Sequence, residues 1–214
     1  MTTETNPRSQ RAQSLVRALT QDRQTKTGEV FPAILRLPGP RADLKRCLGL
    51  DLDAPQYDRA WSHLAPYLPE GGDPDEERAF AAVAAMVCAQ RPAGREQDLQ
   101  PRPSDRPRPR NLGASLAHSV AGRGESVENA ASHRLILIGR QNLAGVHRLV
   151  PRTALHLREQ GIAIDWAQLI GDLADWRRYH RPIARRWIQD FHRTIHRIET
   201  NNRGTGPDTE SETK

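Results

Sequence analysis

Apolar residues recur every three or four positions along most of the chain, the spacing of one face of an α-helix. The clearest stripes are Phe80, Val83, Ala84 and Val87; Trp166, Leu169, Ile170, Leu173 and Trp176; and Ile183, Trp187, Phe191, Ile195 and Ile198. Helix-start signals precede the first two stripes at Asp73-Pro74 and at Asp165. The pattern predicts further helices over residues 10–22, 29–37, 58–68, 112–120, 126–138 and 144–159.

The run Leu135 to Ile138 has the composition of a strand, but no partner strand with β-branched alternation accompanies it. We therefore interpret it as part of a buried helix. The fold class predicted from the pattern is all-α, a two-lobed helical bundle joined by a Pro/Arg-rich loop.

The loop is residues 91–110, where five prolines and six arginines occur in twenty residues. Prolines remove backbone donors and arginines repel one another, so this segment is expected to be an exposed, disordered connection. The predicted organisation is an N-terminal helical lobe over 1–90, this loop, a C-terminal helical lobe over 111–199, and a polar disordered tail over 200–214.

Charge is distributed unevenly along the 214 residues, and 29 of the 32 basic residues are arginine. Residues 1–90 carry 11 basic and 12 acidic side chains, whereas residues 91–200 carry 19 arginines and 11 acids. A basic C-terminal half indicates a polyanionic partner, most often nucleic acid. The alternative is a solvated arginine-rich surface without such a partner.

Other classes of protein are not favoured by the sequence. No apolar run approaches the roughly 20 residues of a membrane helix, and residues 1–11 lack the apolar stretch of a secretory signal. The two cysteines, Cys47 and Cys88, form no CxxC pair, which fits a reducing cytoplasm. We therefore expect a cytoplasmic protein with no membrane partner.

No constellation of side chains predicts an enzyme, a metal or a cofactor. His192 and His196 are four apart, but Arg193 stands where the zinc-protease motif has Glu, and no third ligand is evident. Asp172 and Asp175 are one turn apart without a second carboxylate cluster. We interpret these aspartates as solvent-facing or paired with Arg178 and Arg177.

Several short motifs in the C-terminal half occur in a distinctive order. They are Asn111-Leu112-Gly113-Ala114-Ser115-Leu116, His133-Arg134-Leu135-Ile136-Leu137-Ile138, Ile164-Asp165-Trp166-Ala167-Gln168-Leu169, Asp172-Leu173-Ala174-Asp175-Trp176 and Trp187-Ile188-Gln189-Asp190-Phe191. In this order the chain resembles the CasB family, the small subunit of the type I-E CRISPR surveillance complex called Cascade. The resemblance covers about residues 111–193 and extends more loosely to 33–36 and 80–90.

The resemblance implies a non-catalytic subunit in antiviral defence. It implies contact with the CRISPR guide RNA and with the target or displaced DNA strand, which would stabilise the R-loop between guide and target. The implied protein partners are the backbone and large subunits of Cascade and a second copy of the chain. Such a role would need phosphate contacts, because base pairing to the guide carries the sequence information.

Six arginines are the candidate nucleic-acid-binding residues. Arg36 matches the first arginine of the family's L-R-R motif, and Arg41 is expected to replace the second. Arg134 matches the second arginine of the R-R-F motif, and Arg140 a basic residue just after it. Helical spacing adds Arg148 and Arg152, which share one face. Two other functions stay open: a scaffold whose arginines pair with acidic protein surfaces, and a nuclease.

The four tryptophans fall on apolar stripes, so we expect them to lie in the core and not to stack on bases. Trp176→Ala and Trp187→Ala should each lower the free energy of unfolding by roughly 3–5 kcal/mol, measured by chemical denaturation. If either variant kept its stability and lost single-strand binding, that ring would be a stacking platform.

Overall fold

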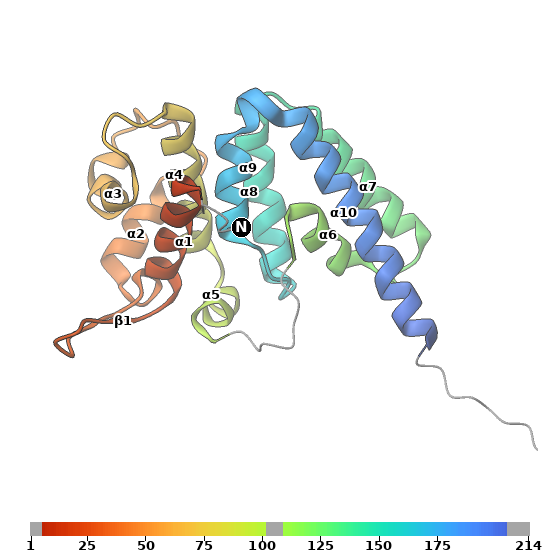
Figure 1. Ribbon diagram of the computed structural model, residues 1–214, viewed down its shortest axis with the longest axis horizontal. Coiled ribbons are helices and arrows are strands. Elements are labelled where there is room, and N and C mark those ends of the chain that lie inside the picture. Colours follow the sequence, from red (N-terminus) through yellow and green to blue (C-terminus); the bar gives the residue numbers. More distant parts are fainter. Residues whose placement is uncertain (1–5, 102–108, 205–214) are drawn as a thin grey trace, which may run out of the picture.

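The computed structural model describes residues 6–101 and 109–204, and the chain is almost entirely helical. The N-terminal half contains α1 (Pro7–Thr20), α2 (Pro38–Arg46), α3 (Tyr57–Leu64), α4 (Pro74–Ala89) and α5 (Pro92–Leu99), with short 3-10 turns η1 (Ile34–Arg36) and η2 (Ala65–Tyr67). A small antiparallel ribbon, β1 (Arg23–Gln24) and β2 (Val30–Phe31), projects from this half (Figure 1). The C-terminal half contains α6 (Leu112–Val120), α7 (Glu125–Gly139), α8 (Leu143–Glu159), α9 (Trp166–Ala174) and α10 (Trp176–Gly204).

Side-chain caps start three helices of the C-terminal half, α6, α8 and α9. Asn111 accepts a hydrogen bond from the Ala114 amide at 3.1 Å, and Asp165 accepts one from the Gln168 amide at 2.9 Å. Each cap satisfies a backbone donor that the first helical turn leaves without a partner. The predicted starts at Asp165 and Asp73 are confirmed, and the predicted helices over residues 112–120, 126–138 and 144–159 correspond to α6, α7 and α8.

The two halves meet along α8 and α9, which lie in the middle of the molecule (Figure 1). Helix α9 packs against α1 and α4 of the N-terminal half, while α10 packs against α6 and α7. Buried side chains from both halves form one hydrophobic cluster. The all-α helical bundle predicted from the sequence is therefore confirmed, and its two halves share one core.

The centre of the C-terminal lobe is a pair of tryptophans. Trp176 and Trp187 are completely buried, and their ring centroids lie 5.2 Å apart. Trp166 is also buried, whereas Trp61 is half-buried against the core. The interpretation of these rings as core residues is confirmed. Helix α10 bends at Tyr179, whose φ and ψ angles are not helical. Trp176 therefore lies before the bend, and Trp187 lies in the longer part of the helix after it.

Helices α6 and α10 approach so closely that only glycine fits at one position. A Cβ atom on Gly113 would overlap the carbonyl oxygen of Trp187. A second glycine, Gly139 at the end of α7, would place its Cβ 2.8 Å from the Cβ of Ala184. Gly113 thus brings α6 against the backbone of α10, and Gly139 brings α7 against the Ala184 side chain of α10.

Three predicted segments differ from the structure. Residues 29–37 are not a helix: they contain β2 and η1, and α2 begins directly afterwards at Pro38. The expectation of a disordered tail over 200–214 is wrong for residues 200–204, which belong to α10; residues 205–214 lie outside the described residues. The expectation that residues 91–110 are disordered is wrong for 92–99, which form α5 with Pro92 at its first position, where proline needs no amide. Residues 102–108 lie outside the described residues.

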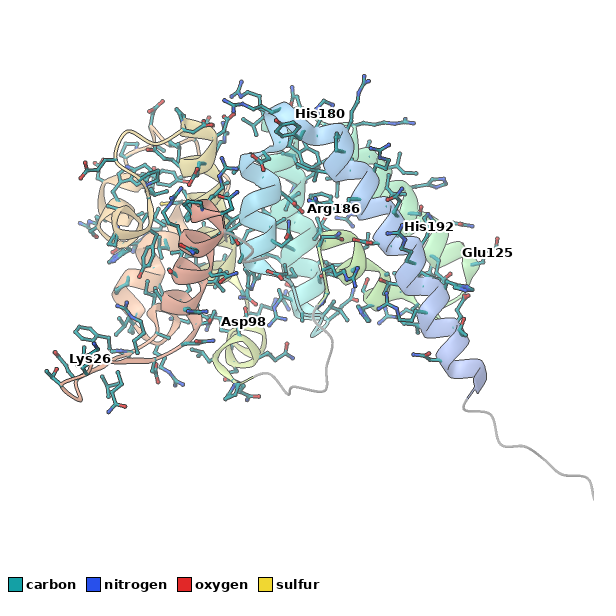
Figure 2. All side chains as sticks on the ribbon, in the orientation of Figure 1. Lys26, Asp98, Glu125, His180, Arg186 and His192 are labelled. Carbon is teal, nitrogen blue, oxygen red and sulfur yellow. The ribbon has the colours of Figure 1, made fainter. Side chains whose placement is uncertain are left out.

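Helix α5 is held by a buried ion pair. The Arg158 side chain, 2% exposed, lies 2.9 Å from the carboxylate of Asp98, which is 8% exposed. Arg158 also donates to the Gln90 side chain and to the carbonyls of Gly94 and Ile162 at 2.8–2.9 Å. Asp98 in turn accepts from the indole of Trp166 at 3.0 Å. In Figure 2, Asp98 lies on α5 below the central helices.

Removing Asp98 should destabilise the protein, because it leaves the Arg158 charge buried without its counter-ion. We expect Asp98→Ala to lower the free energy of unfolding by about 3–5 kcal/mol in a denaturant titration. The matched control is Glu159→Ala, which removes the exposed ion pair between Glu159 on α8 and Arg91, the residue directly before α5, and should cost less than about 1 kcal/mol. Equal losses in the two variants would contradict this account of α5.

A buried histidine lies on the central helix α8. His147 is 7% exposed, and its Nε2 atom has no hydrogen-bond partner among the described residues. Burial, together with the nearby Arg78 charge, lowers the pKa of His147 from 6.5 to about 4, although Asp75 and Asp51 oppose this shift. The folded protein therefore keeps this imidazole neutral at a pH where an unfolded chain has protonated it.

This lowered pKa makes folding sensitive to acid. Stability from this group is complete above pH 6.5 and is lost as the pH falls toward about 4, by up to about 3 kcal/mol, because only the unfolded chain takes up the proton. Urea titrations across this range should show that His147→Leu loses less stability on acidification than the parent. If parent and variant followed the same pH dependence, His147 would not be the group responsible.

Candidate nucleic-acid interface

Four of the six candidate arginines lie on two consecutive helices. Arg134 is on α7, Arg140 caps its C-terminal end, and Arg148 and Arg152 are on α8. All four are exposed. Within residues 6–101 and 109–204, none of the four forms an ion pair. We call these residues the α7–α8 arginines.

Local structure decides how these side chains are presented. Arg148 and Arg152 are one turn apart on α8 and follow the same face as exposed His156, as the spacing predicted. Pro151 lies inside α8 without ending it. Arg134 and Arg140 lie on either side of Leu137 in the sequence, and the Leu137 side chain is 55% exposed. The turn between the helices is fixed because the Trp176 indole donates to the Gln141 carbonyl at 3.0 Å.

The remaining two candidates lie in the other half of the molecule and have partners within the chain. Arg36, in η1, forms a 3.1 Å ion pair with Asp22. Arg41, at the start of α2, donates to the Leu35 carbonyl at 3.3 Å. Helix α2 is at the left of Figure 1 and α7 at the right, so the structure does not gather all six arginines into one cluster.

Other arginines bind carboxylates from distant parts of the chain. Arg8 and Arg11 of α1 both contact Glu76 of α4, at 2.9 and 2.5 Å. Arg177 donates two hydrogen bonds to Asp75, which lowers the pKa of that carboxyl. These side chains are used to join helices, which distinguishes them from the exposed α7–α8 arginines.

The interpretation of the two α9 aspartates is corrected by these contacts. Asp172 is not solvent-facing: it is 2% exposed and accepts hydrogen bonds from Arg186 and from the Trp187 indole. Burial raises its pKa, although these donors oppose the shift. Asp175 pairs with Arg8 at 2.6 Å and not with Arg178 or Arg177. Figure 2 labels Arg186 beside α9 and the central part of α10.

The exposed α7–α8 arginines, which have no ion-pair partner in the described chain, are suited to binding anions. Among the described residues, no three His, Cys, Asp or Glu side chains gather into a group that could hold a metal. His192 lies 3.5 Å from the hydroxyl of Ser132. No helix in the described part of the chain has the length and apolar character needed to span a bilayer.

Two further exposed arginines, Arg181 and Arg185, are not among the six candidates that the sequence predicts. They lie on the side of α10 that faces α7, and neither forms an ion pair within the described ranges. In the sequence, Arg185 and Arg186 lie on the polar side of this helix, opposite Ile183 and Trp187, but the spacing does not show which of them pairs with a carboxylate.

The profile of the family "CRISPR-associated protein Cse2" matches residues 40–192 of this chain. The chain belongs to the Cse2 family. Two solved chains, described as "CRISPR RNA-guided surveillance complex" and the same complex "pre-nicking", are each 39% identical to this Cse2-family chain with a TM-score of 0.74. The superposition covers 91% of this chain and 99% and 98% of those chains.

Two more distant structures share the fold. CasB from M. ruber is 22% identical with a TM-score of 0.63, covering 89% of this chain and 97% of its own. A Cse2-family protein from Thermus thermophilus is 21% identical with a TM-score of 0.55, covering 85% and 97%. No curated protein sequence matches the chain significantly. The resemblance to the CasB family inferred from the motifs is confirmed.

Proposed function

We propose that this Cse2-family protein is a non-catalytic subunit of a CRISPR RNA-guided surveillance complex and that it holds nucleic acid by its phosphates. The observation that carries the proposal is the exposure of the α7–α8 arginines without acidic partners in the described chain, in a family whose relatives occur in such complexes. The proposed partners are the guide RNA, the target or displaced DNA strand and the other subunits of the complex.

The physical basis is phosphate neutralisation. An arginine without an internal carboxylate keeps its full charge available, and each phosphate it binds releases condensed counter-ions into solution. Such contacts tolerate any base sequence, which suits a complex in which base pairing to the guide reads the target. The α7–α8 arginines, at four positions on adjoining helices, would follow a strand backbone.

Arg36 and Arg41 complete the proposed set at the other half of the molecule. The ion pair of Arg36 with Asp22 is exposed on both sides, 51% and 44%, so it contributes little and can exchange for a phosphate. Arg41 uses one guanidinium nitrogen for the Leu35 carbonyl and keeps other donors. A strand that used all six residues would have to cross the seam along α8 and α9.

The proposal predicts a change in salt dependence. Neutralising two α7–α8 arginines in Arg148→Gln/Arg152→Gln should weaken single-stranded DNA and RNA binding equally for different sequences, and should reduce the slope of log K against log salt by about 1.4. Folding should not change, because exposed arginines contribute little to stability. A gel-shift series at increasing salt measures both quantities.

The matched control is Arg46→Gln/Arg193→Gln, which removes the same charge from two exposed arginines, each paired with an aspartate three residues earlier. This control should retain most of the parent's slope of log K against log salt. Equal slopes for all three proteins would contradict phosphate binding by Arg148 and Arg152. No strand binding by the parent even at low salt would favour the protein scaffold instead, and cleavage of the strand would favour a nuclease.

A further inference from the structure

A groove of about 310 Å³ lies between the C-terminal end of α7 and the adjoining part of α10. Its lining is largely aliphatic and includes Ile136, Gly139, Ala184 and Ile188. The two helices approach closely here, since a Cβ atom on Gly139 would lie only 2.8 Å from the Cβ of Ala184. The groove is therefore a feature of rigid helix packing and not of a loop.

Three arginines surround this apolar lining. Arg140 comes from the end of α7, and Arg181 and Arg185 come from α10. All three are exposed, and none has an ion-pair partner in the part of the chain that the structure describes. Gln189 is the remaining polar side chain among the described residues of the lining. Three like charges close to one another favour an occupant that brings negative charge.

The lining favours a protein segment over a nucleotide. Proteins that hold single strands in grooves use aromatic rings on which bases stack, and the described lining contains none. Aliphatic side chains between two helices instead accept a large apolar side chain from a peptide, as in helix-in-groove recognition. Leu137 on α7, 55% exposed, adds apolar surface on the same helix.

We propose that this groove docks an acidic amphipathic segment of another subunit of the surveillance complex. One large apolar side chain of that segment would enter between Ile136 and Ile188, and its carboxylates would pair with Arg181 and Arg185, which leaves Arg140 to the phosphates. The proposal rests on the proposed function, because it takes the partner from the same complex. It assigns the two arginines of α10 a role separate from phosphate binding.

The test is assembly of the whole complex. The chain is co-expressed with the guide RNA and the other subunits encoded in the same genome, and its amount in the purified complex is measured. Arg181→Glu/Arg185→Glu should lower this amount roughly tenfold, since both charged contacts become repulsive. Gln189→Trp, which covers the lining without changing charge, should lower it as well. The control is Arg178→Glu/Arg197→Glu, with the same charge change on α10 outside the groove; it should be retained like the parent.

The outcomes separate this inference from the proposed function. If the parent does not enter the complex, the proposed function fails. If the parent enters and both groove variants are retained like the control, the function stands and the docking groove is overturned. Single-strand binding by the free variants supplies the third outcome: a loss of strand affinity in Arg181→Glu/Arg185→Glu beyond that of the control would make the groove a nucleotide site and overturn peptide docking.

Discussion

The buried ion pair between Arg158 and Asp98 fixes the segment that connects the two halves of the sequence against the end of α8. Arg158 is at the end of α8, yet its guanidinium contacts side chains and carbonyls from the end of α4, from α5 and from the segment before α9. A buried guanidinium is tolerated only when its donors have partners, and here the described contacts supply them at 2.8–2.9 Å. These contacts anchor the C-terminal end of α8, the helix that carries Arg148 and Arg152.

The arginines of this chain divide into two groups by what surrounds them. Those at the contacts between helices, such as Arg8 and Arg158, use the acidic residues of the chain as partners. The α7–α8 arginines, by contrast, have no acidic partner within the described ranges. The excess positive charge of the chain is therefore available at the α7–α8 arginines and not at the paired arginines between helices. This difference supports a role for the α7–α8 arginines in binding.

Much of the fold could be predicted because its signals act within one helical turn, as at the caps of Asn111 and Asp165. Predictions failed where the deciding contact lies elsewhere. Helix α5 depends on Arg158, which comes much later in the chain, and the proline content of the segment concealed it. Similarly, Arg177 and Arg148 look alike in sequence, but Asp75, 102 residues before Arg177, neutralises only the former. The family motifs identified Arg134 and Arg140 as candidates. The groove lined by Arg185 could not be predicted, because it forms only where α7 packs on α10.

The contact between Gly113 and the backbone of Trp187 has a consequence for sequence divergence within this architecture. A side chain of any size at that position would push α10 away from α6, and the tryptophan pair that α10 carries would lose its packing. No change at the facing position can compensate, because the atom in the way is a main-chain oxygen that every residue carries. At other positions of α6, a substitution can be compensated by a change in the residue that it contacts, but at Gly113 it cannot. Retained glycine here would therefore mark the helix crossing even in chains whose remaining motifs have become unrecognisable.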